Sequence, residues 1–361
     1  MKKTLLLIAT LLASYVGMAQ ETYQPTAENL KAREQFQDDK FGIFLHWGLY
    51  SMMGTTEWIM TNRDINYKEY PKLAKTFYPS EFDADAWIKA IKAAGAKYIT
   101  ITTRHHDGFS LFKTATSTYN SVDGSPFKRD IIKELADACK RHDIKLHLYY
   151  SHLDWGREDY PVGRTGTGTG RPKEKANWAS YYKFMNTQLT ELLTNYGKVG
   201  AIWFDGWWDH DSDAKPFDWQ LEEQYALIHK LQPQCLVANN HHHTPFPGED
   251  IQIFERDLPG ENKAGLSGQS IGRLPLESCQ TINEHWGYNI TDTLYKSPKE
   301  LIQMLVRAAG KNANLLLNIG PEPGGALPEL ALNRLQAIGE WLNKYGETIY
   351  GTRGGIVGPH E

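Results

Sequence analysis

The stretch Val-Gly-Ala-Ile-Trp-Phe-Asp-Gly-Trp-Trp, from Val199 to Trp208, decides how the rest of the chain is interpreted. Small and apolar residues bounded by Gly200 and Gly206 predict a short strand that is buried on both faces. A carboxylate, Asp205, stands at its C-terminal end among Trp and Phe side chains. A turn or helix cap would explain an aspartate there. It would not explain the indole rings beside it, because exposed Trp is unfavourable unless something flat and partly apolar packs on it.

Composition limits the class of protein. The chain has 361 residues, is 41% hydrophobic and carries a formal charge of −4, which allows one large barrel or two modest domains. Near-neutral charge spread along the chain provides no basic face, so nucleic acid is not an expected partner. The three cysteines are scattered and form no disulfide or metal-binding spacing.

The N-terminus predicts a targeting segment. Lys2 and Lys3 precede an apolar run over 5–16, and Gly-Met-Ala follows at 17–19. This pattern is typical of a secretory signal peptide, here residues 1–19, and no later run is long enough to span a membrane. We therefore expect a periplasmic or secreted protein whose catalytic domain occupies 20–361.

Strand and helix patterns alternate along the chain. Apolar or β-branched runs predict strands at 41–48, 97–104, 144–150, 199–205, 235–239, 250–254, 276–282 and 314–319. Helical spacing predicts helices at 83–94, 131–142, 176–196, 220–231, 298–309 and 328–345. Such alternation indicates parallel βα units and favours a (β/α)8 TIM-like barrel. The alternative is an open doubly wound sheet, but no glycine-rich phosphate motif follows the first strand.

Polar residues collect at the C-terminal ends of the predicted strands. They are His46, His105, His106, Tyr150, Asp205, His241 and Glu255, whereas the N-terminal ends hold little that ionises. In a barrel these C-terminal ends form the mouth where reactive groups gather. The asymmetry therefore predicts a catalytic barrel.

Carboxylates, histidines and indoles together favour glycoside hydrolysis. That reaction needs one acid to protonate the leaving oxygen and a second carboxylate as nucleophile or base, while aromatic faces hold the sugar. Neutral imidazoles suit the recognition of hydroxyl groups. We expect Asp205 to be the nucleophile and Glu255 the acid/base.

A metal-dependent barrel hydrolase is the alternative chemistry. His241-His242-His243 contains a His-x-His spacing, and His105-His106-Asp107 adds further ligand types. Against this, the first strand ends in a single histidine, His46, rather than in a His-x-His pair. We therefore expect neither a metal nor another cofactor.

Six motifs in order resemble the catalytic domain of the family 29 α-L-fucosidases. They are Phe-Gly-Ile-Phe-Leu-His-Trp-Gly (41–48), Glu-Trp (57–58), Arg-His-His-Asp-Gly-Phe (104–109), Leu-Tyr-Tyr-Ser-His-Leu-Asp-Trp (148–155), Trp-Phe-Asp-Gly (203–206) and Trp-Gly-Tyr (286–288). The similarity runs from about residue 28 to residue 355. It implies a retaining exo-glycosidase that acts on terminal α-L-fucose of glycans, with Asp205 as nucleophile.

The resemblance also implies roles for other side chains. The sugar hydroxyls would be bound by His46, Glu57, His105 and His106, and the apolar edge and methyl group would be lined by Trp58, Trp203 and Trp286. Tyr150 rather than Tyr149 matches the family's tyrosine on the third strand, and strand alternation lets only one of the two face the mouth.

The resemblance leaves the acid/base and the domain content open. Glu255 is the first choice, Glu277 the second and Glu249 the third. His241, counted among the substrate-binding residues, stands where some members have an arginine before the acid/base. Family members commonly carry a C-terminal β-sandwich, for which the sequence to Glu361 has no room. A fucose-binding protein without turnover is the alternative function.

Overall fold

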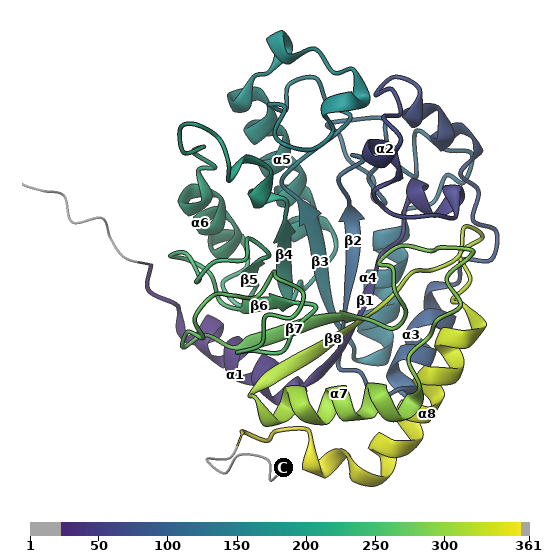
Figure 1. Ribbon diagram of the computed structural model, residues 1–361, viewed down its shortest axis with the longest axis vertical. Coiled ribbons are helices and arrows are strands. Elements are labelled where there is room, and N and C mark those ends of the chain that lie inside the picture. Colours follow the sequence, from purple (N-terminus) through teal and green to yellow (C-terminus); the bar gives the residue numbers. More distant parts are fainter. Residues whose placement is uncertain (1–22, 355–361) are drawn as a thin grey trace, which may run out of the picture.

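The computed structural model describes residues 23–354, which fold into a barrel of eight parallel strands (Figure 1). The predicted barrel is therefore confirmed. Its strands are β1 (Phe41–Leu45), β2 (Tyr98–Arg104), β3 (Lys145–Ser151), β4 (Ala201–Asp205), β5 (Leu236–Asn239), β6 (Gln252–Glu255), β7 (Leu276–Thr281) and β8 (Ala313–Ile319).

The strands follow one another around the barrel in chain order. The hydrogen-bonded order is β5-β4-β3-β2-β1-β8-β7-β6, and a single bridge from Ala238 to Ile251 joins the ends. An open doubly wound sheet would instead reverse its strand order at a switch point. That alternative is wrong, because the order never reverses and the barrel is nearly closed.

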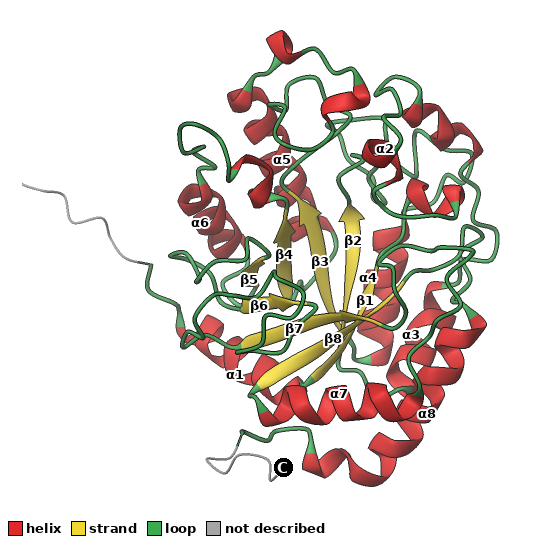
Figure 2. Ribbon diagram, in the orientation of Figure 1, coloured by secondary structure: helices red, strands yellow, loops and turns green. Residues whose placement is uncertain are grey.

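Helices cover the outside of the barrel (Figure 2). They are α3 (Ala84–Ala93), α4 (Ile131–His142), α5 (Trp178–Asn195), α6 (Leu221–Leu231), α7 (Pro298–Gly310) and α8 (Glu329–Tyr345), while the short α2 (Ile59–Asn62) lies among the loops beyond the C-terminal ends of the strands. Side chains cap several of them, and at the start of α7 Ser297 forms a full capping box with Glu300. Between residues 236 and 281, β5, β6 and β7 succeed one another through loops alone.

A further helix, α1 (Ala27–Asp39), is missing from the predicted elements because its residues are mostly polar on every side. The Thr26 side chain caps its start, and Lys40 ends it in the left-handed region at φ 57°. Its Phe36 is buried, 5.5 Å from the ring of Tyr98 inside the barrel. This helix therefore closes the N-terminal end of the barrel and leaves the opposite end as the mouth.

Strand alternation divides the core into two layers. One set of side chains packs under the helices, and the other fills the barrel, with Phe44, Tyr98, Tyr149, Trp203, Ile253 and Leu316 among its members. Large aromatic groups thus fill the interior, as expected for a packed barrel rather than a pore. Above this layer, the next inward position on each strand reaches the mouth.

Two predictions concern the ends of the chain. The signal peptide predicted at residues 1–19 lies outside the described residues, and the absence of a β-sandwich stays a prediction. Across residues 23–354, no helix combines the length and apolar character that a bilayer crossing requires.

Candidate active site

The carboxylate of Asp205 lies at the C-terminal end of β4, in the barrel mouth, with 13% of its side chain exposed. Its Oδ2 accepts a hydrogen bond from the Tyr149 hydroxyl at 3.0 Å. Its Oδ1 accepts from the Gly206 amide at 2.8 Å and from Trp208 Nε1 at 3.0 Å. Burial, and next the charge of Glu255, raises the pKa of Asp205 to about 6.

A glycine follows this carboxylate for a geometric reason. Gly206 has φ +95°, which L side chains rarely adopt, and a Cβ there would lie 3.0 Å from the Leu153 backbone nitrogen. The turn brings the Gly206 amide and the Trp208 indole back onto Asp205. The glycine that bounds the predicted strand is therefore what lets the chain fold over its own carboxylate.

Glu255, the last residue of β6, lies beside Asp205. The side-chain nitrogen of Asn240 donates to Glu255 Oε2 at 2.7 Å and lies 3.4 Å from Asp205 Oδ1. His242 Nε2 lies 3.0 Å from the same Oε2. Burial alone would raise the pKa of Glu255, but the hydrogen bonds and charge of His242, with Asn240, hold it below its usual value.

One shared nitrogen limits the distance between the two acids. The contacts of 3.4 and 2.7 Å mean that Asp205 Oδ1 and Glu255 Oε2 cannot be farther apart than those two lengths combined. This limit allows the about 5 to 5.5 Å that separates the carboxyl groups of retaining glycosidases. The two acids are therefore close enough to act on opposite sides of one glycosidic bond.

The two other predicted acids have different surroundings. Glu277 lies inside the barrel, where it accepts hydrogen bonds from Tyr98 at 2.6 Å and Trp203 at 2.8 Å, and burial raises its pKa to about 7. Glu249 accepts a hydrogen bond from the Tyr225 hydroxyl and contacts His241 Nε2, each at 3.0 Å. Of the three candidates, Glu255 is the one that shares a hydrogen-bond partner with Asp205.

The three predicted histidines form a contiguous group in the mouth. His106 Nε2 lies 3.5 Å from Asp205 Oδ2, the ring of His105 lies 4.1 Å from that of His106, and His46 is 5.7 Å from His105. Burial lowers the pKa of His46 to about 4 and the pKa values of His105 and His106 well below the usual value. All three rings are therefore neutral near pH 7.

The prediction that Tyr150 faces the mouth is wrong. Alternation does point the two tyrosines in opposite directions, but Tyr149 is the one that reaches Asp205. The hydroxyl of Tyr150 donates instead to Gln188 of α5 at 2.8 Å, outside the barrel. Tyr149 is therefore the tyrosine of β3 that faces the mouth.

The ring of His241 is paired with Glu249, and its predicted role in sugar binding stays a prediction. Its Nε2 contacts the Glu249 carboxylate at 3.0 and 3.1 Å, and its Nδ1 accepts from the His243 amide at 3.0 Å. Both ring nitrogens are thus occupied by the loop. Its neighbour His242, whose backbone turns at φ +66°, reaches Glu255.

Aromatic side chains surround the carboxylates, as the sequence predicts. Trp58 stacks on Trp208 with ring centres 5.5 Å apart and meets His106 edge-on at 5.9 Å. Trp286 lies 5.2 Å from His46. Trp203 packs below, parallel to Tyr149 at 5.6 Å and only 2% exposed, so it supports the floor rather than a side wall.

The predicted Glu57 connects two loops of this wall. It is buried, and its Oε2 accepts a hydrogen bond from the Gly287 amide at 2.9 Å, directly after Trp286. The structure therefore brings Glu57, Trp58 and Trp286 to the same mouth as Asp205.

Sequence reasoning missed Asn240, His242, Tyr149 and the supporting groups Ser151 and Asn318. Asn240 could have been found, because it follows β5 directly and stands two positions beyond Ala238, whose side chain points into the barrel. The direction of His242 depends on a left-handed backbone that no local pattern announces.

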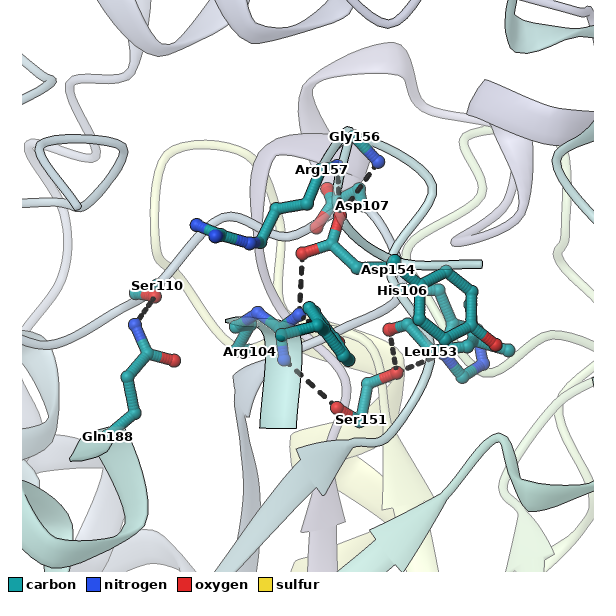
Figure 3. Close-up of polar contacts among 12 residues, drawn as sticks. Arg104, His106, Asp107, Ser110, Ser151, Leu153, Asp154, Gly156, Arg157 and Gln188 are labelled. Carbon is teal, nitrogen blue, oxygen red and sulfur yellow. Dashed lines mark hydrogen bonds and ion pairs between the residues drawn. The ribbon is translucent and has the colours of Figure 1, made fainter. Parts of the chain in front are cut away.

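A buried ion pair holds the loop under the histidines (Figure 3). Arg104 contacts Asp154 at 2.5 Å and donates to the Ser151 carbonyl at 2.9 Å. Asp154 in turn accepts from the amides of Gly156 and Arg157 at 2.7 and 2.9 Å. The ends of β2 and β3 are thus fixed to each other next to His106.

The residues raised as possible metal ligands are not gathered into one cluster. Asp107 accepts from the Phe109 amide and the Tyr70 hydroxyl, and burial raises its pKa to about 7. In the part of the chain that the structure describes, no three His, Cys, Asp or Glu side chains are arranged to hold a metal ion.

Comparisons with known proteins agree with this geometry. Residues 10–347 match the family described as Alpha-L-fucosidase. The chain is 31% identical to the plasma alpha-L-fucosidase of Rattus norvegicus, over 96% of this chain and 77% of that protein. Among solved structures, alpha-L-fucosidase isoenzyme 1 from Paenibacillus thiaminolyticus has a TM-score of 0.81 and 35% identity, covering 91% of this chain and 79% of that one. AlfC from Lactobacillus casei, in complex with its α-L-fucose product, has a TM-score of 0.76 and 27% identity, covering 88% and 99%.

Proposed function

This chain belongs to the alpha-L-fucosidase family of glycoside hydrolases, and we propose that Asp205 and Glu255 perform in it the retaining hydrolysis of terminal α-L-fucose. The observation that carries the assignment of these two acids is the Asn240 nitrogen, which lies within reach of both carboxylates in the barrel mouth. Fucosylated oligosaccharides and glycoconjugates are the proposed substrates.

The reaction proceeds in two displacements. A carboxylate oxygen of Asp205 bonds to the anomeric carbon while the bond to the leaving oxygen breaks, and Glu255 gives its proton to that oxygen. Water then adds to the anomeric carbon and loses its proton to Glu255, which releases Asp205 and fucose with retained configuration. Atoms and charges balance over the cycle, and no further group is needed.

The sugar determines which carboxyl carries the proton. In the empty site, burial and the charge of Glu255 raise the pKa of Asp205 to about 6, while His242 and Asn240 favour the charged form of Glu255. As the leaving group departs, positive charge develops at the anomeric carbon beside Asp205. That charge favours ionised Asp205 and a proton on Glu255, as the first step requires.

The neutral histidines and the aromatic wall bind the sugar in this proposal. His46, His105, His106 and Glu57 contact hydroxyl groups, while Trp58 and Trp286 cover apolar surface and Trp203 supports them from below. Burial supports these roles, because buried imidazoles that stay neutral can make hydrogen bonds without the cost of a desolvated charge.

Hydrolysis of nitrophenyl α-L-fucoside separates an enzyme from a protein that only binds fucose. Asp205→Ala should abolish this turnover without unfolding the protein, and azide should rescue it as fucosyl azide of inverted configuration. Fucose binding with no hydrolysis by the parent protein would support the binding alternative. A folded Asp205→Ala variant that yields no azide adduct would remove Asp205 as nucleophile.

Glu255 and Glu277 are distinguished by leaving-group dependence. With a good aryl leaving group, Glu255→Gln should keep its first step and lose its second, because only the second then needs the base. Glu277→Gln should show no such split, since its partners lie inside the barrel. The opposite pattern would transfer the acid/base role to Glu277.

The N-terminal pattern of Lys2, Lys3 and the apolar run after them supports a further proposal, that the protein is exported to the periplasm or beyond. Sequencing of the N-terminus of the protein from a periplasmic or extracellular fraction tests it. A start near Gln20 is the expected result, and an intact Met1 confined to the cytoplasm would contradict it.

A further inference from the structure

The hydroxyl of Ser151 lies between a carbonyl oxygen and an imidazole. Its Oγ is 2.6 Å from the Leu153 carbonyl and 2.7 Å from His106 Nδ1 (Figure 3). A carbonyl can only accept, so the single hydrogen of Ser151 points to Leu153. Toward His106 the serine offers only a lone pair, and the hydrogen between them must therefore be on Nδ1.

This contact determines what His106 presents to a ligand. Burial holds the pKa of His106 well below its usual value, so the neutral ring carries one hydrogen, on Nδ1. Its Nε2 is then a bare acceptor, 3.5 Å from Asp205 Oδ2, which is an acceptor too. Two neighbouring acceptors leave room for a group that donates a hydrogen bond, such as a hydroxyl.

His46 is fixed in the same way by Asn318. The Nδ2 of Asn318 donates to the Trp286 carbonyl at 2.7 Å, and its Oδ1 lies 2.6 Å from His46 Nδ1. The reversed amide would set its oxygen against the Trp286 carbonyl, so the amide orientation is determined. His46 Nδ1 therefore donates to Asn318, and its Nε2 is a second bare acceptor.

His105 differs from His106 and His46. Its Nδ1 is buried and has no hydrogen-bond partner among residues 23–354, so no neighbouring side chain selects its tautomer. His105 can therefore donate or accept at Nε2, whereas His106 and His46 can only accept there.

We propose that Ser151 and Asn318 are positioning residues that fix His106 and His46 as hydrogen-bond acceptors, so that the site selects ligands with a donating hydroxyl at each of two positions. The inference rests on the proposed function only in taking the ligand to be a sugar. It excludes sugars in which either hydroxyl is alkylated, removed or replaced by fluorine, because fluorine accepts but does not donate.

The rigid surroundings of Ser151 support this role. Ser151 and Arg104 are fully buried, and Arg104 holds the Ser151 carbonyl at 2.9 Å while it pairs with Asp154. The hydrogen of the serine hydroxyl cannot turn toward His106 without losing its bond to the Leu153 carbonyl. The tautomer is therefore imposed by the end of β3 rather than chosen by the ligand.

Nitrogen-15 NMR of histidine-labelled parent protein tests the tautomers without any turnover. Signals of His106 and His46, assigned through His106→Gln and His46→Gln, should each show a protonated Nδ1 and an unprotonated Nε2. In Ser151→Ala the His106 signal should shift toward a mixture of tautomers while His46 stays unchanged. A protonated Nε2 in the parent protein would overturn the proposal even if fucoside hydrolysis is normal.

Sugar analogues test the consequence for selectivity. Fucose and its derivatives with one ring hydroxyl replaced by hydrogen or fluorine are compared as competitive inhibitors of nitrophenyl fucoside hydrolysis. At two positions the fluoro sugar should bind about tenfold or more worse than fucose, as the deoxy sugar does. Ser151→Ala should reduce this loss of affinity for the fluoro sugar severalfold at one of the two positions only, because His106 of the variant can then donate through Nε2.

Ser278→Ala is the matched control. Ser278 is equally buried, donates to the Asp257 carbonyl at 2.6 Å and accepts from Gln280 at 3.1 Å, but within residues 23–354 it has no hydrogen bond to a histidine. This variant should lose a similar amount of stability, and at both positions it should still bind the fluoro sugar as much worse than fucose as the parent protein does. Equal changes in the two variants, or a parent protein that binds every fluoro sugar as well as fucose, would overturn the proposal.

Discussion

The hydroxyl of Tyr149 donates a hydrogen bond of 3.0 Å to Oδ2 of Asp205, the oxygen that also faces His106. A donor in this place stabilises the ionised carboxylate. Burial and the charge of Asp205 raise the pKa of Tyr149 well above its usual value, so the phenol keeps its hydrogen throughout the working range. Tyr149 is therefore a permanent donor to the proposed nucleophile.

Tyr149→Phe should move the acidic limb of kcat/KM to higher pH. The pKa of Asp205, already raised to about 6, rises further without the donor, and the protonated acid cannot attack. At pH 6 and below we expect kcat/KM to fall by about tenfold or more, from a lost hydrogen bond to a charged group of about 1.5 to 3 kcal/mol. The pH dependence of nitrophenyl fucoside hydrolysis measures the shift.

Tyr150→Phe is the control for this change. It removes the hydroxyl that donates to Gln188 at 2.8 Å and leaves Asp205 untouched. Its stability should fall while its acidic limb stays in place. A similar shift in both variants would mean that the Tyr149 contact does not set the charge of Asp205.

The orientation of these tyrosines shows what the sequence could and could not predict. The apolar runs that form strands, and the polar residues at their ends, are local features, so the barrel and the mouth residues His46, His105, His106, Asp205 and Glu255 were predictable. Which of two alternating side chains faces inward depends on register. Tyr149 pairs with Trp203 and Ser151 with Asp205 across the sheet, and that pairing is not contained in either strand alone.

Two other differences between the predictions and the structure, in α1 and in the loop after β5, also arise from tertiary contacts. Helix α1 has few apolar residues and is held by Phe36 packing into the distant end of the barrel, so its own pattern gives no helical stripe. The choice of His242 over His241 depends on a positive φ at residue 242 and on Glu249, which holds His241 away from the mouth. Tertiary contacts, rather than local propensity, decide both.

His242→Ala should raise kcat/KM near neutral pH for a substrate with a poor leaving group. His242 lowers the pKa of Glu255 against the effect of burial, so its removal raises that pKa and increases the protonated fraction of the acid that this substrate needs. The ratio of kcat/KM for a poor and a good leaving group at neutral pH provides the measurement. His243→Ala, an exposed neighbour, should leave this ratio unchanged, and a fall of the ratio in His242→Ala would contradict the assignment.

Glu277→Gln should remove a pH dependence of stability. Burial raises the pKa of Glu277 from the usual 4.5 to about 7, so between these values the folded state binds more protons than the unfolded state. The contribution of this group is therefore complete below about pH 4.5 and is lost as the pH rises through 7. The stability of the parent relative to the variant should fall by about 3 kcal/mol from about pH 4 to about pH 8. Urea unfolding at several pH values measures this difference, and a constant difference would contradict the raised pKa.

Arg104→Met should destabilise the protein by about 3 to 5 kcal/mol, because it leaves the Asp154 carboxylate buried without its cation. Both side chains of this pair are at most 1% exposed, so water cannot replace the guanidinium. The double variant Arg104→Met/Asp154→Leu should recover part of the loss, since it removes the unpaired charge. Chemical denaturation of the two variants measures both effects.

Lys133→Met, which breaks a pair whose side chains are 49% and 48% exposed, should stay close to the parent protein in stability. If Arg104→Met were as stable as Lys133→Met, the pair would not be what holds the end of β3, and the fixed position of Ser151 beside His106 would need another cause.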